Sequence, residues 1–190
     1  MKNILVINAN PKSSSFSHAL ADSYELQARE QAEVKRINLV ELDFNISLDS
    51  GYDDVQPLEP SLESFQESVL WADHIVIVSP IWWGGLPAKF KGLLDRTFLP
   101  GFAFKFEEGS AEPKQLLTGK TSRLILTMDA PHDYAEVQAQ PVIEQLDRFT
   151  LQFSGMEAAK LTLIGSVIGA DKTQRDEWLK LVGELGATGL

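Results

Sequence analysis

The sequence predicts a doubly wound α/β protein, in which one parallel sheet of five strands is covered by helices on both faces. Two observations carry this prediction. Short apolar runs with the length of fully buried strands recur along the 190 residues, and segments with helical periodicity lie between them. A chain of this length can bury a sizeable core, and we expect residues 1–190 to form a single domain.

The predicted strands are rich in β-branched residues and leucine. The most apolar runs cover residues 4–7, 75–78, 124–126 and 161–164. A weaker run at 34–39 fits a less buried strand near an edge of the sheet. Two stretches, 44–60 and 100–120, look irregular and are long for plain connections, which makes them candidate functional loops.

The predicted helices carry apolar residues three or four positions apart, and this spacing turns one helix face toward the core. These residues are Leu62, Phe65 and Val69; Phe90, Leu94 and Thr97; Val142, Leu146, Phe149 and Phe153; and Trp178, Leu181, Val182 and Leu185. Pro87 suits the first turn of the second of these helices. The last helix is expected to start at a cap formed by Asp171 with Gln174, or by Thr173 with Asp176.

Composition narrows the classes of function. The chain has no cysteine, which excludes disulfides, and its three histidines lie far apart, so no metal site is expected. The net charge of -10 argues against nucleic acid or an anionic membrane as a partner. No apolar run approaches a signal sequence or the roughly 18 residues of a membrane span. We therefore expect a cytoplasmic protein without membrane insertion.

The most informative segment, residues 79–96, reads Ser-Pro-Ile-Trp-Trp-Gly-Gly-Leu-Pro-Ala-Lys-Phe-Lys-Gly-Leu-Leu-Asp-Arg. Two tryptophans beside two glycines suit a slot for a planar ring, at the end of a strand where open α/β sheets bind ligands. The segment resembles the flavin-contacting loop of the flavodoxin-like NAD(P)H:quinone oxidoreductases, the family of DT-diaphorase and its bacterial relatives. The matching residues are Pro80, Ile81, Trp83, Pro87, Ala88, Lys91, Gly92, Asp95 and Arg96. Gly84 departs from the pattern, because DT-diaphorase has a second aromatic residue there.

A second motif follows the first predicted strand. Four serines lie at this strand-to-helix junction, where they either cap an ordinary helix or help to bind an anion. The loop resembles the family's Ser/Thr-Ser-Phe-Asn run, which holds the flavin phosphate. Ser14, Ser15 and Phe16 match this run, whereas Ser17 replaces the usual Asn and Asn10 replaces a frequent His. These departures leave FMN and FAD both open.

A third motif, Thr-Met-Asp-Ala-Pro-His-Asp-Tyr at 127–134, follows the fourth apolar strand region. In the resembling family the matching loop covers the pyrimidine side of the flavin. The resemblance implies flavin binding by Thr127, Met128 and Asp129. It also implies that Tyr134 and His132 are catalytic, steadying charge on the reduced flavin. The open alternatives are that Asp129 caps a turn and that His132 is an ordinary exposed loop residue.

Five strands and five helices fit the flavodoxin-like fold, with strand order 2-1-3-4-5. The resemblance implies an NAD(P)H dehydrogenase (quinone) that binds FMN or FAD. NAD(P)H would pass hydride to flavin N5, and a quinone, nitroaromatic or azo compound would then take two electrons. The flavin is expected against Pro80, Ile81, Trp82, Trp83 and Gly84, with backbone N–H groups of residues 81–83 facing its O4/N5 edge.

The family's active site lies at a homodimer interface. We therefore expect a homodimer, with Phe102, Phe104 and Phe106 facing the partner. The open alternative is that these three residues are buried under their own loop. Three other functions remain open: an electron-carrier flavodoxin, a regulatory flavoprotein subunit of a potassium-efflux antiporter, and an α/β binding module without flavin. The carrier is disfavoured because its Thr-x-Thr-Gly-Asn-Thr phosphate loop is missing.

Overall fold

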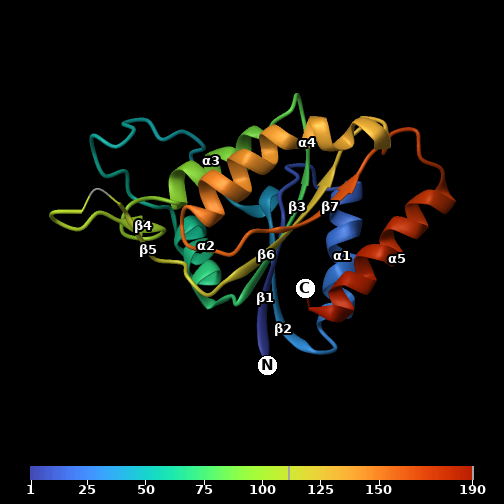
Figure 1. Cartoon of the computed structure of the whole chain (residues 1–190), viewed down its shortest axis with the longest axis horizontal. Helices are drawn as coiled ribbons and strands as arrows, with labels where there is room; N and C mark the ends of the chain where they lie inside the picture. Colours follow the sequence, from blue (N-terminus) through green and yellow to red (C-terminus); the bar gives the residue numbers. More distant parts are fainter. Residues whose placement is uncertain (111, 190) are drawn as a thin grey trace.

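A computed structural model describes residues 1–110 and 112–189, with the backbone but not the side chain of His132. Its main sheet has five parallel strands in the order β2-β1-β3-β6-β7 (Figure 1). Counted along the chain within this sheet, the order is the predicted 2-1-3-4-5. The strands are β1 (Lys2–Asn8), β2 (Ala32–Asn38), β3 (His74–Pro80), β6 (Thr121–Thr127) and β7 (Lys160–Ile164).

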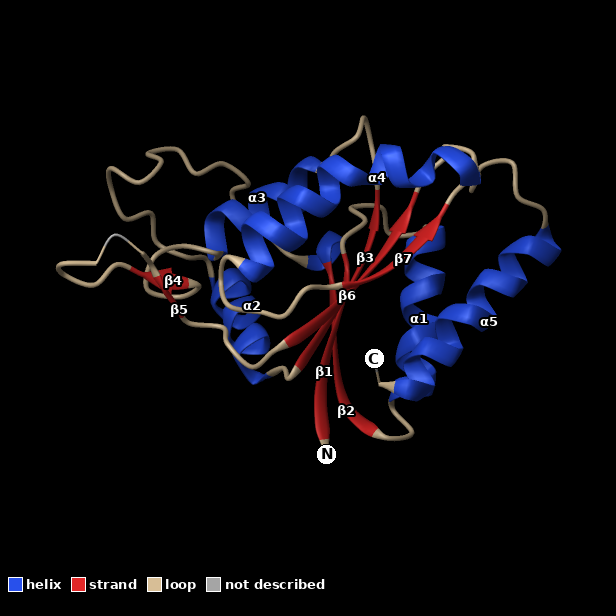
Figure 2. Ribbon diagram, in the orientation of Figure 1, coloured by secondary structure: helices blue, strands red, loops and turns tan. Residues whose placement is uncertain are grey.

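Helices cover both faces of this sheet (Figure 2). One face packs against α1 (Phe16–Ala28) and α5 (Lys172–Thr188). The other packs against α2 (Pro60–Trp71), α3 (Ala88–Thr97) and α4 (Ala135–Ile143), which continues as the π-helical η3 (Glu144–Gln152). Two short 3-10 turns, η1 (Leu39–Glu41) and η2 (His132–Tyr134), follow β2 and β6.

Strand β3 shows why the apolar runs predict the sheet. Every residue of β3 is buried, with Ile75 and Ile77 in the core under α2, α3 and α4. Val76 and Val78 lie in the second core, under α1 and α5. A strand with helices on both faces must be apolar at successive positions, because its side chains alternate between two cores.

The predicted apolar stripe after Val142 is only half correct. Val142 and Leu146 are fully buried, but 64% of Phe149 and 40% of Phe153 remain exposed. The cause is the π-helical backbone of η3, whose wider turns shift the residues after Leu146 off a 3.6-residue stripe. Leu151 is buried instead.

Helix α5 also differs from its predicted stripe. Asp171 caps the helix by accepting from the Gln174 N–H, which is the first of the two predicted caps. Val182 is fully buried, but Leu181 is exposed, because α5 approaches α1 through glycines. A Cβ on Gly186 would lie 2.2 Å from the Tyr24 carbonyl oxygen, so this close helix packing requires glycine.

The two long loops have different structures. The stretch 100–120, predicted to be irregular, contains a small antiparallel hairpin of β4 (Phe104–Lys105) and β5 (Lys114–Gln115). The stretch 44–60 contains no strand and leads into α2 at Pro60. Within the described ranges, every helix is too short or too polar to cross a lipid bilayer.

Helix α3 holds the loop before α2. The Arg96 side chain is fully buried and donates to the carbonyl oxygens of Asn45 and Pro57, at 2.5 and 2.9 Å. Its Nη2 also lies 2.8 Å from Glu59 Oε2. One turn earlier, a Cβ on Gly92 would lie 2.4 Å from the carbonyl oxygen of Ile46. Gly92 and Arg96 therefore serve to pack this loop against α3.

Candidate functional site

The carboxyl ends of β1, β3 and β6 meet at one edge of the sheet, around a hollow of about 240 Å³. Loops from four places in the sequence form its wall, as expected where a doubly wound sheet binds ligands. The lining residues are Asn10, Lys12, Ser15, Phe16, Ser17, Pro80, Ile81, Trp82, Thr127, Met128, Asp129, Val167 and Ile168. Most of the predicted binding residues therefore share one hollow, but Ser14, Trp83 and Gly84 are not in its lining.

The loop after β1 forms a polar end of the hollow. Ser15 is the N-cap of α1, and its hydroxyl accepts from the His18 N–H at 3.2 Å. In the part of the chain that the structure describes, the N–H groups of Phe16 and Ser17 have no hydrogen-bond acceptor. These free donors and the α1 dipole favour an anion, and Lys12 adds a positive charge at the rim.

The Asn10 side chain arranges this loop. Its side-chain oxygen accepts from the Lys12 N–H at 3.0 Å, and its NH₂ group donates to the Ser17 hydroxyl oxygen at 3.3 Å. Asn10 and Ser17 are both buried, so these bonds form away from bulk water. The Ser17 hydroxyl keeps its own hydrogen for another acceptor.

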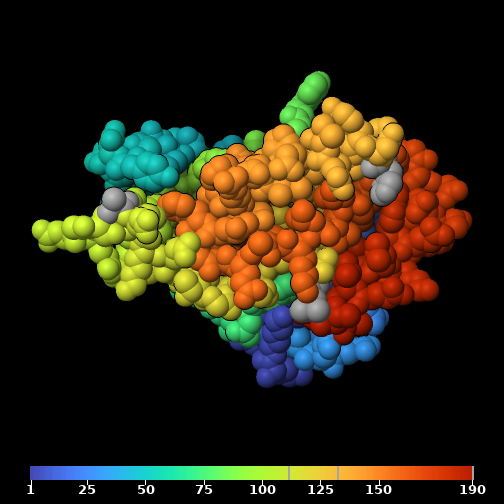
Figure 3. All heavy atoms as spheres, viewed as in Figure 1, coloured from blue at the N-terminus to red at the C-terminus, as the bar shows by residue number. Residues whose placement is uncertain are grey.

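The turn after β3 separates the two tryptophans. Trp82 and Gly85 exchange backbone hydrogen bonds of 3.0 and 2.9 Å, and Trp83 and Gly84 between them have φ values of 53° and 66°. Positive φ at both central residues is typical of a type I′ turn. Trp82 lines the hollow, whereas the Trp83 side chain is fully exposed. Figure 3 shows the tip of this turn as green spheres projecting from the molecule.

The turn's backbone corrects one expectation. The Ile81 N–H donates to the Thr127 carbonyl oxygen at 2.8 Å, and the Trp82 N–H donates to Gly85. The prediction that these two N–H groups face a flavin edge is therefore wrong. Both are consumed in joining β3 to β6 and in closing the turn.

The third wall comes from β6 and from the loop after β7. Asp129 Oδ1 accepts from the Ile168 N–H at 2.8 Å, so this carboxylate joins the loop after β6 to the loop after β7. The Val167 N–H donates to the Met128 carbonyl oxygen at 3.2 Å. Sequence reasoning missed Lys12, Val167 and Ile168. The last two could have been found, because the predicted strand 161–164 must end at the same sheet edge.

Helix α5 supports both the polar end and the third wall. The guanidinium carbon of Arg175 lies 5.3 Å from the centroid of the Phe16 ring, and the Trp178 ring packs on Phe16 at 5.8 Å. Arg175 also donates to the carbonyl oxygens of Val167 and Ala170. This one side chain therefore links Phe16 to the loop after β7.

The predicted catalytic pair lies in η2. Tyr134 is exposed and does not line the hollow. The side chain of His132 lies outside the described part of the structure. The catalytic roles of Tyr134 and His132 stay predictions.

Comparison with known proteins gives two decisive matches. The family model for the flavodoxin-like fold matches residues 2–182. An uncharacterized NAD(P)H oxidoreductase of Haemophilus influenzae is 30% identical, over 96% of this chain and 93% of its own. The chain therefore belongs to the flavodoxin-like family, which includes this NAD(P)H oxidoreductase.

Solved structures agree with the fold of this oxidoreductase family. The NAD(P)H:quinone oxidoreductase from Methanothermobacter marburgensis superposes with a TM-score of 0.76 at 18% identity, over 98% of both chains. An FMN-dependent NADH-azoreductase from Bacillus anthracis, solved in complex with FMN, superposes with a TM-score of 0.72 at 20% identity, over 99% of both. The hollow at the carboxyl edge of the sheet is the candidate functional site of this fold.

Proposed function

We propose that this protein is an FMN-dependent NAD(P)H:quinone oxidoreductase whose flavin occupies the hollow at the carboxyl edge of the sheet. One observation carries the proposal. A polar end with free N–H donors and a wall containing tryptophan and methionine belong to the same hollow. A phosphate at one end and a flat ring at the other fit a phosphorylated flavin.

The donor set supports the phosphate end. The Phe16 and Ser17 N–H groups, the Ser17 hydroxyl and Lys12 offer neutral and charged donors from one short loop. Donors of this kind at a helix N-terminus favour a phosphate. FMN is proposed over FAD because a flavodoxin-like azoreductase of the same fold holds FMN.

A flavin bound in the hollow would supply the two-electron redox chemistry between NAD(P)H and a quinone-like acceptor. The chain's own residues bind and orient. Trp82 from the loop after β3 and Ile168 from the loop after β7 both line the hollow and would shield a bound ring from water. Asp129 acts through Ile168, because its bond to the Ile168 N–H holds this wall in place.

A second copy of this chain is the proposed partner. Beside α3 and η3 lies a separate groove of about 290 Å³, whose aromatic lining includes Tyr52, Phe104 and Phe149. Phe104 packs edge-on against Phe106 and Phe153, and Phe106 and Phe149 are exposed. Phe102, by contrast, packs on Phe98 in its own chain. A homodimer would cover this surface, and Phe149→Glu is expected to yield monomers in light-scattering measurements.

The first test is the absorbance spectrum of the purified protein before and after anaerobic addition of NADH or NADPH. Flavin bands that bleach within seconds, followed by release of FMN on heating, are the expected result. Bands that neither nucleotide bleaches would favour an electron carrier or a regulatory flavoprotein. A protein that binds no added flavin would overturn the proposal.

A further inference from the structure

We propose that His18 is a positioning residue for the phosphate of the bound flavin. In its neutral form, with the proton on Nε2, His18 holds Asn8 in the orientation that arranges the 10–17 loop. This inference rests on the proposed function, but its first step is fixed by contacts within the chain itself.

The orientation of Asn8 is unambiguous. Asn8 is the last residue of β1 and is fully buried. Its Oδ1 lies 3.2 Å from the backbone nitrogen of Asn10, which can only donate. The other end of the Asn8 amide must therefore be the NH₂ group, and it faces His18 Nδ1 at 3.2 Å and Asn38 Oδ1 at 3.4 Å.

The tautomer of His18 follows from this orientation. An NH₂ group can only donate, so Nδ1 of His18 must accept and carries no proton. The proton of the neutral ring is then on Nε2, which lies 3.6 Å from Asp22 Oδ1. A doubly protonated ring would bring an N–H against the Asn8 NH₂ group, and that contact repels.

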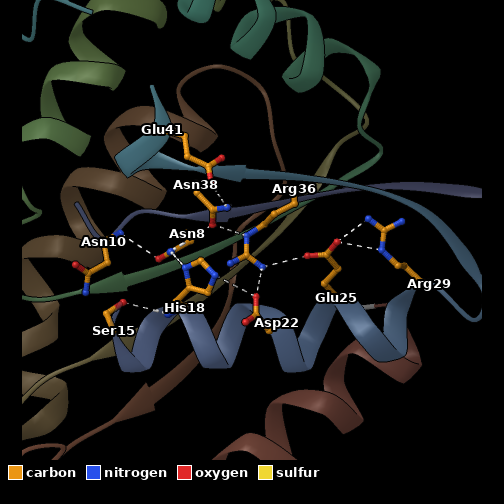
Figure 4. Close-up of polar contacts among 10 residues, drawn as sticks. All are labelled: Asn8, Asn10, Ser15, His18, Asp22, Glu25, Arg29, Arg36, Asn38 and Glu41. Atoms are coloured by element: carbon orange, nitrogen blue, oxygen red, sulfur yellow. Dashed lines mark hydrogen bonds and ion pairs between the residues drawn. The ribbon is translucent and has the colours of Figure 1, made fainter. Parts of the chain in front are cut away.

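The contacts run from His18 to the anion loop (Figure 4). His18 holds Asn8, and Asn8 holds the Asn10 N–H. The Asn10 side chain then fixes Lys12 and Ser17, which line the polar end of the hollow. If Asn8 turned over, its NH₂ group would face the Asn10 N–H, and the bond between Asn8 and Asn10 would be lost.

The charged groups near His18 come from its own helix α1 and from β2. On its own helix Asp22 faces Nε2, and Arg36 of β2 lies 3.2 Å from the same Asp22 oxygen. Arg36 also pairs with Glu25 at 3.1 Å, and Glu41 accepts from Asn38. The Asp22 carboxylate therefore lies on the Nε2 side of the ring, and the Asn8 amide lies on the Nδ1 side.

Two substitutions at His18 test the proposal. His18→Leu removes the acceptor for Asn8, whereas His18→Asn can place an uncharged oxygen near the position of Nδ1. Affinities for FMN and for riboflavin, which lacks the phosphate, would be measured by fluorescence quenching. We expect His18→Leu to weaken FMN binding about tenfold and to leave riboflavin binding unchanged. His18→Asn should restore most of the loss. Asp22→Leu, a control on the other side of the ring, should change the FMN-to-riboflavin ratio less than twofold.

The tautomer gives a second readout. Nitrogen-15 NMR of the flavin-free protein at pH 8 should show His18 protonated on Nε2 alone.

The outcomes separate this proposal from the proposed function. Wild-type protein that binds neither flavin removes both proposals. Wild-type protein that binds FMN, with His18→Leu binding it equally well, removes only the role of His18. Equal losses for FMN and riboflavin would mean that His18 serves general stability alone, and a proton on Nδ1 would contradict the Asn8 contact. Either result overturns the inference.

Discussion

The two halves of the segment 79–96 differ in what they contact. The first half, Pro80 to Gly85, leaves the sheet and turns at its edge, where Trp82 lines the hollow and Trp83 is fully exposed. The second half lies in α3, where Gly92 and the buried Arg96 pack against the loop that precedes α2. The segment that resembles the family therefore includes both residues that line the hollow and residues that pack α3 against the neighbouring loop. The difference teaches that residues of a family pattern need not all serve its chemistry.

The largest expected effect comes from a substitution in the second half of the segment, which lies in α3. Arg96→Met removes the guanidinium that joins the carbonyl oxygens of Asn45 and Pro57 to Glu59. It should lower the free energy of unfolding by about 3 kcal/mol, since buried acceptors and a carboxylate lose their partner. Urea denaturation measures this loss. As control, Arg29→Met removes an exposed pair with Glu25 and should cost about 0.5 kcal/mol or less. Equal losses would contradict the buried role of Arg96.

Gly92→Ala should have the next largest effect. The new methyl group would overlap the Ile46 carbonyl oxygen, and the loop must move to admit it. We expect a loss of about 1–3 kcal/mol in unfolding free energy and faster proteolysis within 44–59. Gly85→Ala, in the first half of the segment, is the matched control. Its methyl group would meet only the Trp82 carbonyl oxygen, at an ordinary 3.6 Å, so its loss should be the smaller.

Low pH should weaken the contact between Arg96 of α3 and Glu59, and so lower the stability of the protein. Burial acts to raise the pKa of this carboxyl, but hydrogen bonds from the Asn45 N–H and from Arg96 outweigh it and lower the pKa. The stability that Glu59 contributes is therefore present above its unfolded pKa and is lost as pH falls through the lower folded value. Denaturation from pH 6 to 3 should show a steeper decline for wild type than for Glu59→Gln. If the stability of the two proteins fell equally with pH, the proposed contribution of Glu59 would be contradicted.

The smallest effect concerns the exposed turn. Trp83 holds φ at 53°, a conformation that costs most residues about 1 kcal/mol but that Asn adopts readily before Gly in type I′ turns. Trp83→Asn should therefore raise the free energy of unfolding by roughly 0.5–1 kcal/mol. Thermal unfolding followed by circular dichroism checks this. A lower melting temperature would show that the Trp83 side chain contributes to folding through contacts, against its exposure in the structure.

Local pattern was sufficient to predict much of the fold and of the site. The strands are apolar because they are buried on both faces, and their carboxyl ends must share one edge of a parallel sheet. Ser15 and Ser17 could be predicted because a serine-rich strand-to-helix junction is itself a local feature, whereas Asn10 was predicted from the family resemblance. The exposure of Phe149 and Phe153 could not, because a π-helical backbone changes the period on which the prediction depends.

The sequence by itself determined the alternation of strands and helices and the polar loop after β1, because hydrophobic periodicity and helix capping act over a few neighbouring residues. The strand order followed from the known fold that this alternation fits. Only the tertiary structure decided which tryptophan enters the hollow and that Val167 and Ile168 close its wall. It also decided that Gly186 brings α5 onto α1 and that His18 reaches Asn8. These outcomes depend on turn geometry and on contacts between distant segments, which no local pattern of residues encodes.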